Sequence, residues 1–434
     1  MQHIFTDKII LERKYTSYVL SDIKKFKTQL LNFGTRFSNF CFLENNEYNF
    51  NRSYESLAGI GDAHSQVFYS LTELSSYYLK NTDWIFGHVN YDYKNQVEDI
   101  SSANFDGVLF QDVHFFIPEI VFIFRDNEVG IWVKGDRDAL KIFDEINRLE
   151  LMPKNFPSLQ LTPRFSKEEY IETVKELKQH ITHGDCYEIC FCQEFYSSDT
   201  VVDPVKIYGN LNELSPNPFS AFYKLEDKFL ACASPERFLK KTGNEIISQP
   251  IKGTVRRNLN DSSADDNQKE NLFLNEKERA ENIMIVDLVR NDLSKICSEA
   301  TVKVNEFLGI HSFPQVHQMI STITGKLKDE ITLEEIFKAT FPMGSMTGAP
   351  KKRAMELIEK YERTKRGLFS GTIGYINPEG DFDFNVVIRS ILYNEADKYV
   401  SIQAGSAITF LSDPEKEFEE CEIKITAMKQ ALIL

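Results

Sequence analysis

The chain has 434 residues, is 42% hydrophobic and 26% charged, and carries a formal net charge of −15. This composition is typical of a soluble globular protein with one large or two medium domains. The acidic balance disfavours a protein that binds nucleic acid or an anionic membrane, but it is compatible with a local basic pocket for a small acidic substrate.

The first 150 residues alternate short apolar runs with Asn, Asp and Gly turns, which predicts a mostly β N-terminal lobe with a few helices. The N-terminal segment has no long apolar core of a secretory signal. Residues 108–124 are the most apolar stretch, but charged residues and a proline interrupt them, so they predict a pair of strands rather than a membrane span. Residues 152–166 contain three prolines and predict a connector.

A helix is predicted directly after this connector. Ser166 and Glu169 have the spacing of a capping box, and Gly184 is the expected end of the helix. Strands are then expected over 187–195, 218–225, 228–241 and 244–254, helices over 276–298 and 350–363, a hairpin pair over 382–393 and 399–410, and a last helix from Asp413. Because the order lacks a βαβ rhythm, the sequence predicts an α+β fold with a large antiparallel sheet.

The seven cysteines are an odd number without framework spacing, which indicates a reducing, cytoplasmic environment. Cys186, Cys190 and Cys192 are expected on one face of the strand over 187–195. We interpret them as small buried residues rather than metal ligands, because no matching Cys or His pair stands elsewhere at ligand spacing.

The segment SQPIKGTVRR over 248–257 resembles a strand end that runs into a turn, and it places the amine of Lys252 beside Pro250 and Gly253. Two interpretations are open: an ordinary surface lysine, or a reactive one. A reactive amine has to be unprotonated, and its ordinary pKa is about 10.4. Arg256, Arg257 or a desolvated pocket could lower that pKa.

The helix over 276–298 carries Glu278 and Glu281 three residues apart on one face. Beyond them the sequence IMIVDLV is apolar almost all round, which predicts burial. Asp287 and Arg290 in this segment are therefore expected to form an ion pair within the helix.

Three further features suggest a pocket for a small acid with more than one carboxylate. The loop over 344–348 precedes Pro350 and a helix start, where free N–H groups favour an anion, although the GK[ST] ending of a P-loop is missing. Arg389 lies in the apolar segment VVIRSIL and needs a carboxylate from the protein or from a ligand. Gly405 interrupts a predicted strand and indicates a close backbone approach or a bulge. The structural alternative for the loop is simply a capped helix after a turn.

The last helix is expected to begin with a capping box of Ser412 and Glu415. Glu417, Glu420 and Lys424 form a ladder on the flank of its apolar stripe, where a helix borders a cleft; the alternative is a solvated ion pair. Two helices with acid pairs can supply the oxygen ligands of Mg²⁺, completed by substrate and water.

Six motifs appear in the order in which the chorismate-binding enzymes have them: SPERF (234–238), PIKGT (250–254), ERAENIMIVDLVRNDL (278–293), GSMTGAPKKRA (344–354), GYINPEGDFDFNVVIRS (374–390) and IQAGSAITFLSDPEKEFEECEIK (402–424). The resemblance is strong over residues 165–434, the expected chorismate-binding catalytic domain, and loose before them. It implies an anthranilate synthase component I-like α+β fold of two interleaved lobes, with large antiparallel sheets, flanking helices and the site between the lobes.

Lys252 in PIKGT resembles the lysine of the aminodeoxychorismate synthase branch, whereas the anthranilate, isochorismate and salicylate synthases carry Ala at this place. The resemblance implies that the Lys252 amine attacks C2 of chorismate and expels the C4 hydroxyl, and that ammonia then adds at C4 and expels the lysine. It implies Glu236 of SPERF as the general acid/base at the C4 hydroxyl. The expected product, 4-amino-4-deoxychorismate, belongs to para-aminobenzoate and folate biosynthesis.

The resemblance also assigns ligands and partners. It implies Glu281 and Glu420 as direct Mg²⁺ ligands, with Glu278 and Glu417 acting through waters. Chorismate would be bound by Gly253, Thr254, Thr347, Tyr375, Arg389, Gly405 and Lys424. Since the sequence has no GxCxG nucleophile turn, ammonia is expected from a separate glutamine amidotransferase subunit.

Three positions depart from the family pattern. Glu188 stands where the amination branch usually has Gln and the water-adding enzymes have Lys, which argues against water addition and leaves its effect on the pKa of Lys252 open. Gln318 replaces a His that is tied to pyruvate elimination, and Ala407 replaces a Gly beside the substrate carboxylate. The segment FLENN (42–46) loosely resembles the family's tryptophan-binding segment, but we interpret it as a strand end and turn.

Other functions remain to be weighed. An anthranilate synthase or an isochorismate synthase-type enzyme would share most of these motifs. An inactive homologue would not need Lys252, Glu236 and all four acids, and a pyridoxal-phosphate lysine enzyme would need a phosphate cup that the sequence does not show.

Overall fold

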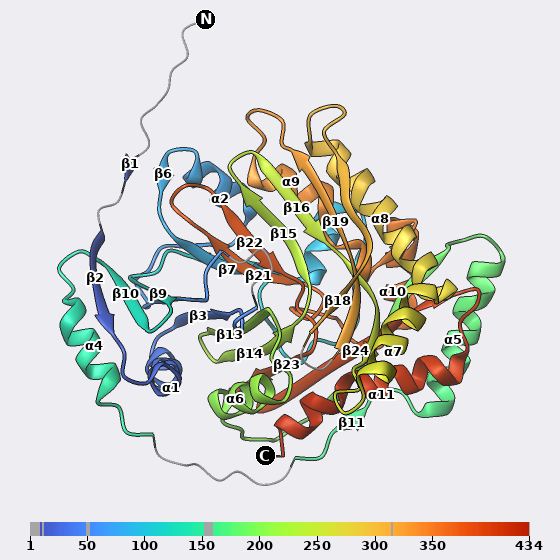
Figure 1. The fold of residues 1–434 in the computed structure, drawn as a ribbon, viewed down its shortest axis with the longest axis horizontal. Coiled ribbons are helices and arrows are strands. Elements are labelled where there is room, and N and C mark those ends of the chain that lie inside the picture. The colour runs from blue at the N-terminus through green and yellow to red at the C-terminus, as the bar shows by residue number, and fades with distance from the viewer. Residues whose placement is uncertain (1–8, 11–12, 49–52, 152–158, 314–315, 434) are drawn as a thin grey trace, which may run out of the picture.

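The computed structural model describes the chain except residues 1–8, 11–12, 49–52, 152–158, 314–315 and 434. Two large antiparallel sheets form the centre of the molecule, with helices packed around them (Figure 1). Strands that precede the proline-rich segment and strands that follow it pair within both sheets. This arrangement confirms the predicted α+β fold of two interleaved lobes. The predicted connector lies partly outside the described residues, which resume at position 159.

The larger sheet has twelve strands among the described residues. Its central pairs join distant segments, because β13 pairs with β3 and β24 pairs with β12. The strand order is β11 (Thr162–Pro163), β12 (Glu188–Ser197), β24 (Tyr399–Thr409), β23 (Ser390–Asn394), β14 (Lys228–Ser234), β13 (Phe219–Leu225), β3 (Asn39–Glu44), β4 (Ser56–Gly61), β9 (Ile120–Arg125), β10 (Glu128–Lys134) and β2 (Arg13–Val19), and β20 (Gly348–Ala349) pairs with β12.

The second sheet has ten strands in the described part of the chain. Its order is β17 (Ile251–Arg256), β19 (Val316–Lys326), β16 (Glu245–Gln249), β15 (Arg237–Thr242), β22 (Phe382–Asn385), β21 (Thr372–Ile376), β7 (Ile85–Val89), β8 (Val113–Phe116) and β5 (Val67–Phe68), and β18 (Lys303–Ser312) pairs with β19. A separate parallel pair joins β1 (Ile9–Ile10) to β6 (Asn81–Thr82). β8 and β9 are the two strands predicted over 108–124.

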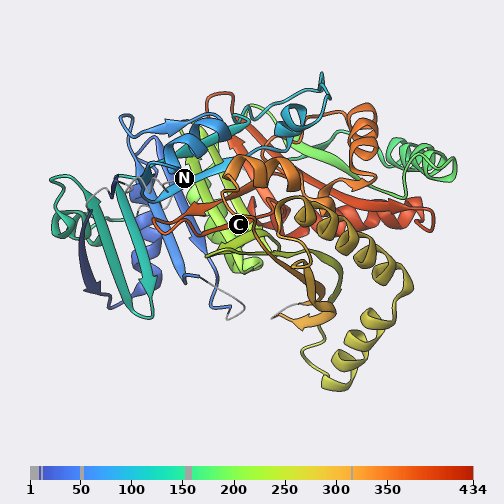
Figure 2. The same cartoon turned by 90° about the horizontal axis from the view of Figure 1, so that it is seen from above.

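The helices are α1 (Ile23–Gly34), α2 (Leu71–Tyr78), α3 (Lys94–Val97), α4 (Ala139–Asn147), α5 (Lys167–Thr182), α6 (Pro204–Leu214), α7 (Ser262–Leu274), α8 (Glu276–Ile296), α9 (Leu333–Thr340), α10 (Lys351–Tyr361) and α11 (Pro414–Ala431), with 3-10 turns η1 (Tyr91–Tyr93) and η2 (Gly344–Met346). α5 has the predicted capping box of Ser166 and Glu169, and Gly184 follows it with a φ of +85°. Figure 2 shows α7 and the start of α8 projecting from the body of the molecule.

The hydrophobic core lies between the sheets and continues on the outer face of the larger sheet. Along β13, Tyr223 and Leu225 belong to the cluster that both sheets share, whereas Phe222 belongs to the cluster that includes side chains of α1, α6 and α11. Side chains of a strand alternate between its two faces, so both faces of β13 are buried. The larger sheet therefore forms the middle layer of the fold.

The predicted strand over 382–393 is wrong as a single element. β22 ends at Asn385 in the smaller sheet, and β23 begins at Ser390 in the larger sheet, so residues 386–389 cross from one sheet to the other. Arg389 lies in this crossing with a φ of +52° rather than inside a strand. Only β23 and β24 form the expected hairpin. The apolar run indicated burial correctly, but it could not show that the buried segment changes sheets.

Two predictions for the helices need correction. Asp287 and Arg290 form the expected ion pair at 2.8 Å, but their side chains are 66% and 53% exposed, because α8 packs on the sheet along one side only. At α11 the cap is Asp413, whose carboxylate accepts hydrogen bonds from the N–H groups of residues 415 and 416. Ser412 instead closes the turn after β24 by accepting from the Thr409 N–H at 3.0 Å.

All seven cysteines are buried and free. Cys190 and Cys192 lie in the core shared by the two sheets, but Cys186 lies in the cluster on the other face of β12 with Ile189 and Phe191. The prediction that the three cysteines share a face is wrong for Cys186, since β12 begins only at Glu188 and strand alternation does not extend back to position 186.

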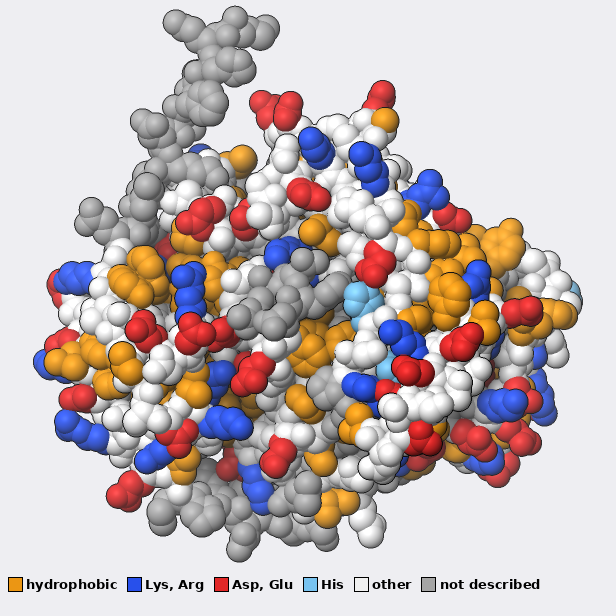
Figure 3. Space-filling model, in the orientation of Figure 1, with side chains coloured by type: hydrophobic (Ala, Val, Ile, Leu, Met, Phe, Trp, Pro, Cys, Tyr) orange, Lys and Arg blue, Asp and Glu red, His pale blue; other side chains and the backbone are white. Residues whose placement is uncertain are grey.

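No helix in the described part of the chain is long and apolar enough to cross a bilayer. On the face shown in Figure 3, basic and acidic side chains are interspersed and form no continuous basic surface. This face offers no extended electrostatic footprint for nucleic acid, in agreement with the net charge of −15.

Candidate active site

Lys252 lies on β17 at an irregularity in strand pairing. β17 is in register with β19 at Ile251 and again at Thr254, and the register shifts between them. Gly253 in the gap has a φ of +91°, and a Cβ on it would lie 3.2 Å from the Oε2 atom of Glu278. Irregularities of this kind redirect side chains. PIKGT is therefore an irregular part of a strand, not a strand end that runs into a turn.

The Lys252 amine lies among carboxylates. Its Nζ atom donates a hydrogen bond to Glu188 Oε1 at 2.8 Å and lies 3.9 Å from Glu281 Oε2. The side chains of Lys252, Glu188 and Glu281 are 11%, 0% and 7% exposed. An ordinary surface lysine is excluded by this burial, because a buried amine needs charged or polar partners.

The pKa of Lys252 is raised above its usual value. Burial alone lowers this pKa, but the negative charges of Glu188 and Glu281 outweigh burial. Arg257 does not offset them, because its guanidinium pairs with Asp265 at 2.7 Å. The expectation that arginines or desolvation leave the amine with a low pKa is therefore wrong for this arrangement of residues.

The acid pairs of α8 and α11 face each other across a lysine. Lys277 Nζ donates to Glu417 Oε1 at 2.8 Å and lies 3.7 Å from Glu281 Oε1, so one ammonium group joins the two helices. Lys424 Nζ lies 2.6 Å from Glu420 Oε1. Glu417 is buried, whereas the side chains of Glu420 and Lys424 are 44% and 30% exposed, so the ladder combines a buried acid with a partly exposed ion pair.

The environment shifts the pKa values of these carboxyl groups in different directions. Burial raises the pKa of Glu281 to about 7, although Lys252 opposes the effect. Burial and the neighbouring Glu420 raise the pKa of Glu278. At Glu420 burial is outweighed by Lys424, so this pKa is lowered.

The chemistry of this group fits a divalent cation. Glu281 Oε1 and Glu417 Oε2 are buried without a hydrogen-bond partner, and carboxylate oxygens are the ligands that Mg²⁺ prefers. Within the described residues, no three Asp, Glu, His or Cys side chains are grouped as a complete metal site. Lys277 lies between the helices where a cation would balance both carboxylates. A bound metal would therefore require this lysine to move.

Glu236 lies on the other side of Lys252, in the segment that joins β14 to β15. Its carboxyl group is 5% exposed and accepts a hydrogen bond from the Ser345 hydroxyl of η2 at 2.7 Å. Burial raises its pKa to about 7, while Ser345 and the positive charge of Lys252 lower it in part. A carboxyl group with this pKa can give or take a proton near neutral pH.

Arg389 and Lys424 close another side of the site. Arg389 Nη1 donates to the Lys424 backbone oxygen at 3.1 Å, and Lys424 Nζ donates to the Gly405 backbone oxygen at 2.8 Å. The sequence predicted that Arg389 binds a carboxylate of the protein or of a ligand. No described carboxylate lies within ion-pair distance of its guanidinium, so a ligand carboxylate remains. A Cβ at Gly405 would lie 2.3 Å from the Phe191 backbone oxygen, which confirms the predicted close approach.

The loop over 344–348 does not form the predicted anion cup. It is buried, it forms η2, and Gly348 and Ala349 pair with β12. A Cβ at Gly348 would lie 2.1 Å from the Glu188 backbone oxygen, so this glycine brings the loop against the strand that carries Glu188. Thr347 is buried, and its backbone oxygen accepts from the Cys190 N–H at 2.8 Å. The loop thus supports the site through Ser345 and β12.

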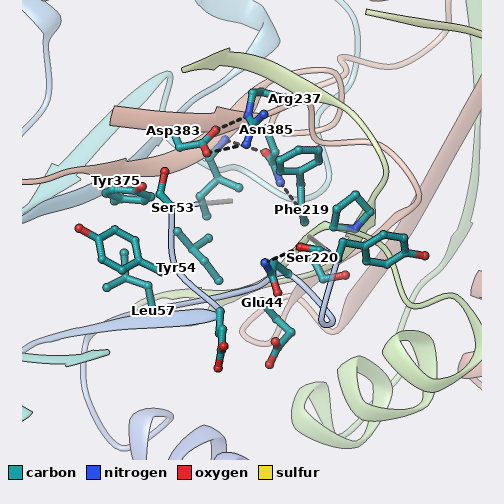
Figure 4. A pocket seen from close by; sticks show the side chains of 16 residues that line it. Glu44, Ser53, Tyr54, Leu57, Phe219, Ser220, Arg237, Tyr375, Asp383 and Asn385 are labelled. Carbon is teal, nitrogen blue, oxygen red and sulfur yellow. Dashed lines mark hydrogen bonds and ion pairs between the residues drawn. The ribbon is translucent and has the colours of Figure 1, made fainter. Parts of the chain in front are cut away.

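Two predicted substrate residues are less central. Thr254 follows the irregular part of β17 and is exposed. Tyr375 does not lie with Lys252 and the acids. It lines a separate cavity of about 70 Å³, which is called the second cavity below (Figure 4). Its ring packs against Tyr54, Trp84 and Phe86. Tyr375 lies on β21, which pairs with β7 of the N-terminal lobe. Its ring is therefore surrounded by N-terminal residues rather than by α8 and α11.

The second cavity includes part of FLENN. β3 ends at Glu44, and Asn46 follows with a φ of +50°, which confirms the predicted strand end and turn. Glu44 and Asn45 line the cavity, and the pair Arg237–Asp383 forms its opposite wall (Figure 4).

The departures from the family pattern lie close to one another in the sheets. Glu188 contacts Lys252 directly. Gln318 is buried on β19 opposite Thr254, and Ala407 is opposite Cys190 of β12.

Sequence reasoning missed Lys277 and Ser345. The signal for Lys277 was its position four residues before Glu281, and Ser345 carried no signal beyond its loop.

A family model described as chorismate binding enzyme matches residues 40–430. The aminodeoxychorismate synthase of Arabidopsis thaliana, described as chloroplastic, is 40% identical over 292 residues, which are 67% of this chain and 31% of that protein. Aminodeoxychorismate synthase component 1 of Bacillus subtilis is 32% identical over 365 residues, 80% of this chain and 76% of that protein. Anthranilate synthase component 1 of Saccharolobus solfataricus is 32% identical over 351 residues, 80% of either chain. The matched region is thus less than a third of the plant protein.

Two solved structures share the fold. Anthranilate synthase component I of Streptococcus pneumoniae superposes with a TM-score of 0.73 at 23% identity, over 98% of this chain and 94% of that one. The menaquinone-specific isochorismate synthase of Escherichia coli superposes with a TM-score of 0.77 at 15% identity, over 98% of this chain and 95% of that one. At these identities the likeness establishes the anthranilate synthase component I-like fold and nothing about the reaction.

Proposed function

The chain belongs to the chorismate-binding enzymes, and within this family we propose that it is component I of an aminodeoxychorismate synthase. The proposed reaction converts chorismate and ammonia to 4-amino-4-deoxychorismate and water, in the route to para-aminobenzoate and folate. The observation that carries the proposal is the Lys252 amine, which reaches from β17 into the centre of the buried acids. The similarity to aminodeoxychorismate synthases supports the same assignment.

The first half of the reaction uses Lys252 and Glu236. Neutral Lys252 forms a bond from Nζ to C2 of chorismate, the two ring double bonds shift, and the C4–O bond breaks. Glu236 in its acid form gives a proton to the leaving hydroxyl, so water departs and a carboxylate remains. A pKa of about 7 keeps Glu236 partly protonated near neutral pH, as this step requires.

The second half reverses the shift. Ammonia forms a bond to C4, the double bonds return, and the electron pair of the C2–N bond returns to Lys252 as a neutral amine. The Glu236 carboxylate takes one proton from the new ammonium group at C4, which restores the acid form. Each half therefore uses the same two side chains in opposite directions.

We propose that Mg²⁺ is held by Glu281 and Glu420, with Glu278 and Glu417 acting through waters. When bound, the ion would supply positive charge for the ring carboxylate of the substrate. The unpartnered oxygens of Glu281 and Glu417 support this assignment.

The remaining contacts to chorismate are proposed from the groups that face the acids. The Arg389 guanidinium, which forms no ion pair with a carboxylate among the described residues, suits the second substrate carboxylate. Lys424, the backbone at Gly405 and Gly253–Thr254, and Thr347 complete the site. Tyr375 is left out of this set because it lies in the other cavity.

A glutamine amidotransferase subunit is the proposed source of ammonia. The name component 1 on the similar Bacillus protein supports a partner subunit. The isolated chain can be tested without it by supplying an ammonium salt.

Product analysis tests the function. The protein is incubated with chorismate, Mg²⁺ and an ammonium salt at mildly alkaline pH, and the products are separated by liquid chromatography with mass detection. We expect 4-amino-4-deoxychorismate without pyruvate. The second candidate, an anthranilate synthase, is favoured by the similarity to the Saccharolobus enzyme; it would give anthranilate with pyruvate. Isochorismate or an absence of turnover would also overturn the proposal.

A further inference from the structure

A small cavity of about 20 Å³ lies beside Glu236. Arg237 lines both this cavity and the one that contains Tyr375. Glu236 and Ser345 form one end of the small cavity. Val289, Asp292 and Leu293 form the wall on α8, where the spacing of three and four residues brings them to one face. Of these, Val289 is half-buried.

The size of the cavity restricts its occupant. A cavity of roughly 10–15 Å³ is enough for one water molecule. The cavity is therefore large enough for one or at most two molecules of that size and too small for a chorismate ring or for glutamine. Ammonia has nearly the size of water and is the only reactant of the proposed reaction that fits.

The walls offer acceptors for N–H groups. The Ser345 hydroxyl donates to Glu236 at 2.7 Å, and the Thr340 hydroxyl donates to the Ile336 backbone oxygen at 2.7 Å. Since each hydroxyl has already placed its only hydrogen, the lone pairs of both oxygens are left to accept. Ammonia can donate three hydrogens to such a wall.

The charges around the cavity favour a neutral guest while Glu236 is in its acid form. Asp292 is the wall carboxylate on α8, but it already pairs with Lys351 at 2.6 Å and with Lys295 at 3.1 Å. The two lysines balance the charge of Asp292, so Glu236 is the lining carboxyl group that could attract an ammonium ion, and only in its ionised form. Neutral ammonia is also the form that has a lone pair for attack on carbon.

We propose that this cavity is the ammonia site of the enzyme, which holds one neutral ammonia molecule beside Glu236 until it adds to C4. The inference rests on the proposed function. The two nucleophiles then reach the ring from different places. The Lys252 amine bonds to C2, and ammonia enters beside Glu236, the carboxyl group that acts at C4. The C4–N bond forms as the C2–N bond to Lys252 breaks, and Glu236 takes the surplus proton.

Filling and enlarging the cavity at Val289 test the proposal. Val289→Phe places a ring in the cavity, and Ile283→Phe adds the same side chain to α8 at a position that is 41% exposed. With ammonium salt varied at saturating chorismate and then the reverse, we expect Val289→Phe to raise KM for ammonia about tenfold or more and to leave KM for chorismate unchanged. Ile283→Phe should leave both unchanged.

Val289→Ala provides a second test in case Val289→Phe does not fold. The enlarged cavity should admit methylamine, so this variant should form the N-methylated product, detected by its mass, at least tenfold faster relative to wild type. An unchanged ammonia KM in a folded Val289→Phe protein, or equal use of methylamine by wild type and Val289→Ala, would show that the cavity is only a packing space. Wild type that forms no aminated product at all would instead refute the proposed function.

Discussion

Glu188 Oε1 accepts a hydrogen bond from Lys252 Nζ at 2.8 Å, and both side chains are almost completely removed from solvent. This pair sets the reactivity of the lysine, because a carboxylate at this distance stabilises the ammonium form, and only the neutral amine is a nucleophile. Glu188 Oε2 is buried and has no hydrogen-bond partner in the part of the chain that the structure describes, so this oxygen is left for a further proton or a substrate group.

Replacing Glu188 should therefore change the pH dependence of the reaction. Because Glu188 and Glu281 raise the pKa of Lys252, kcat/KM for chorismate should rise with pH in the wild type. In Glu188→Gln the charge is lost and the pKa of Lys252 falls, so more of the amine is neutral and kcat/KM at neutral pH should be higher by about tenfold or more. Glu194→Gln is the matched control, since Glu194 lies on the same strand but binds Arg164 and Tyr399. An unchanged kcat/KM at neutral pH would show that Glu188 does not control the amine.

Lys252 itself should be indispensable for amination. Lys252→Ala should lower the rate of formation of the amino product by about a thousandfold or more, as measured by mass detection. Lys252→Arg keeps a positive charge near Glu188 without supplying a comparable nucleophile, so it should be equally inactive. With ammonia withheld, intact wild-type protein should gain the mass of a dehydrated chorismate, and neither variant should. Substantial activity in Lys252→Arg would mean that the charge, rather than the amine, is what the reaction needs.

Mg²⁺ should stabilise the protein more at pH 8 than at pH 6. Burial raises the pKa of Glu281 to about 7, above an ordinary value of about 4.3. The folded state is thus favoured by protonation of this group: its contribution to stability is fully present below about pH 4 and is lost as pH rises through 7. A cation removes this loss only where Glu281 is ionised, so the rise in Tm on adding MgCl₂ should be larger at pH 8.

Two variants check the assignment of that effect. Glu281→Gln should abolish the difference between the two pH values, and Glu276→Gln, which changes an exposed acid on the first turn of α8, should retain it. NaCl at equal ionic strength controls for screening. An equal rise in Tm at both pH values would contradict a role for Glu281 in binding the ion.

Lys277 should be replaceable by a metal ion. Lys277→Gln removes the charge that joins Glu417 and Glu281, so the free energy of unfolding in EDTA should fall by about 1–3 kcal/mol. Because Mg²⁺ can balance the same carboxylates, its addition should restore most of this loss. Denaturant unfolding with EDTA measures the loss of stability, and the same experiment with MgCl₂ measures how much of it the metal restores. Lys269→Gln, an exposed change on α7, should alter neither, and a loss that Mg²⁺ does not restore would place the metal elsewhere.

The fold was predictable where the signal is local. The capping box at Ser166, the helix end at Gly184 and the strands β12 and β13 depend on residues within a few positions of one another. The crossing of residues 386–389 between the sheets was not predictable, because an apolar run looks the same whether it stays in one sheet or changes sheets. For the same reason, the exposure of Asp287 and Arg290 could not be derived from the apolarity of their neighbours.

The candidate site was predictable through its motifs, and its electrostatics were not. The sequence brought together Lys252, Glu236 and the four acids of α8 and α11, but the place of Lys277 between two helices depends on how the helices pack. Tyr375 shows the opposite error, since a residue inside a shared motif faces a different cavity. A motif fixes the order of residues along the chain, whereas the face on which each side chain lies follows from the sheet.

The interleaving of the sheets also determines when the protein can fold during its synthesis. Phe86 of β7 pairs with Tyr375 of β21, and Phe42 of β3 pairs with Phe222 of β13. The early strands leave the ribosome long before these partners exist, so their edges stay open for most of translation. Native pairing is completed only when the last third of the chain has emerged, and open strand edges of this kind can pair with another copy until then.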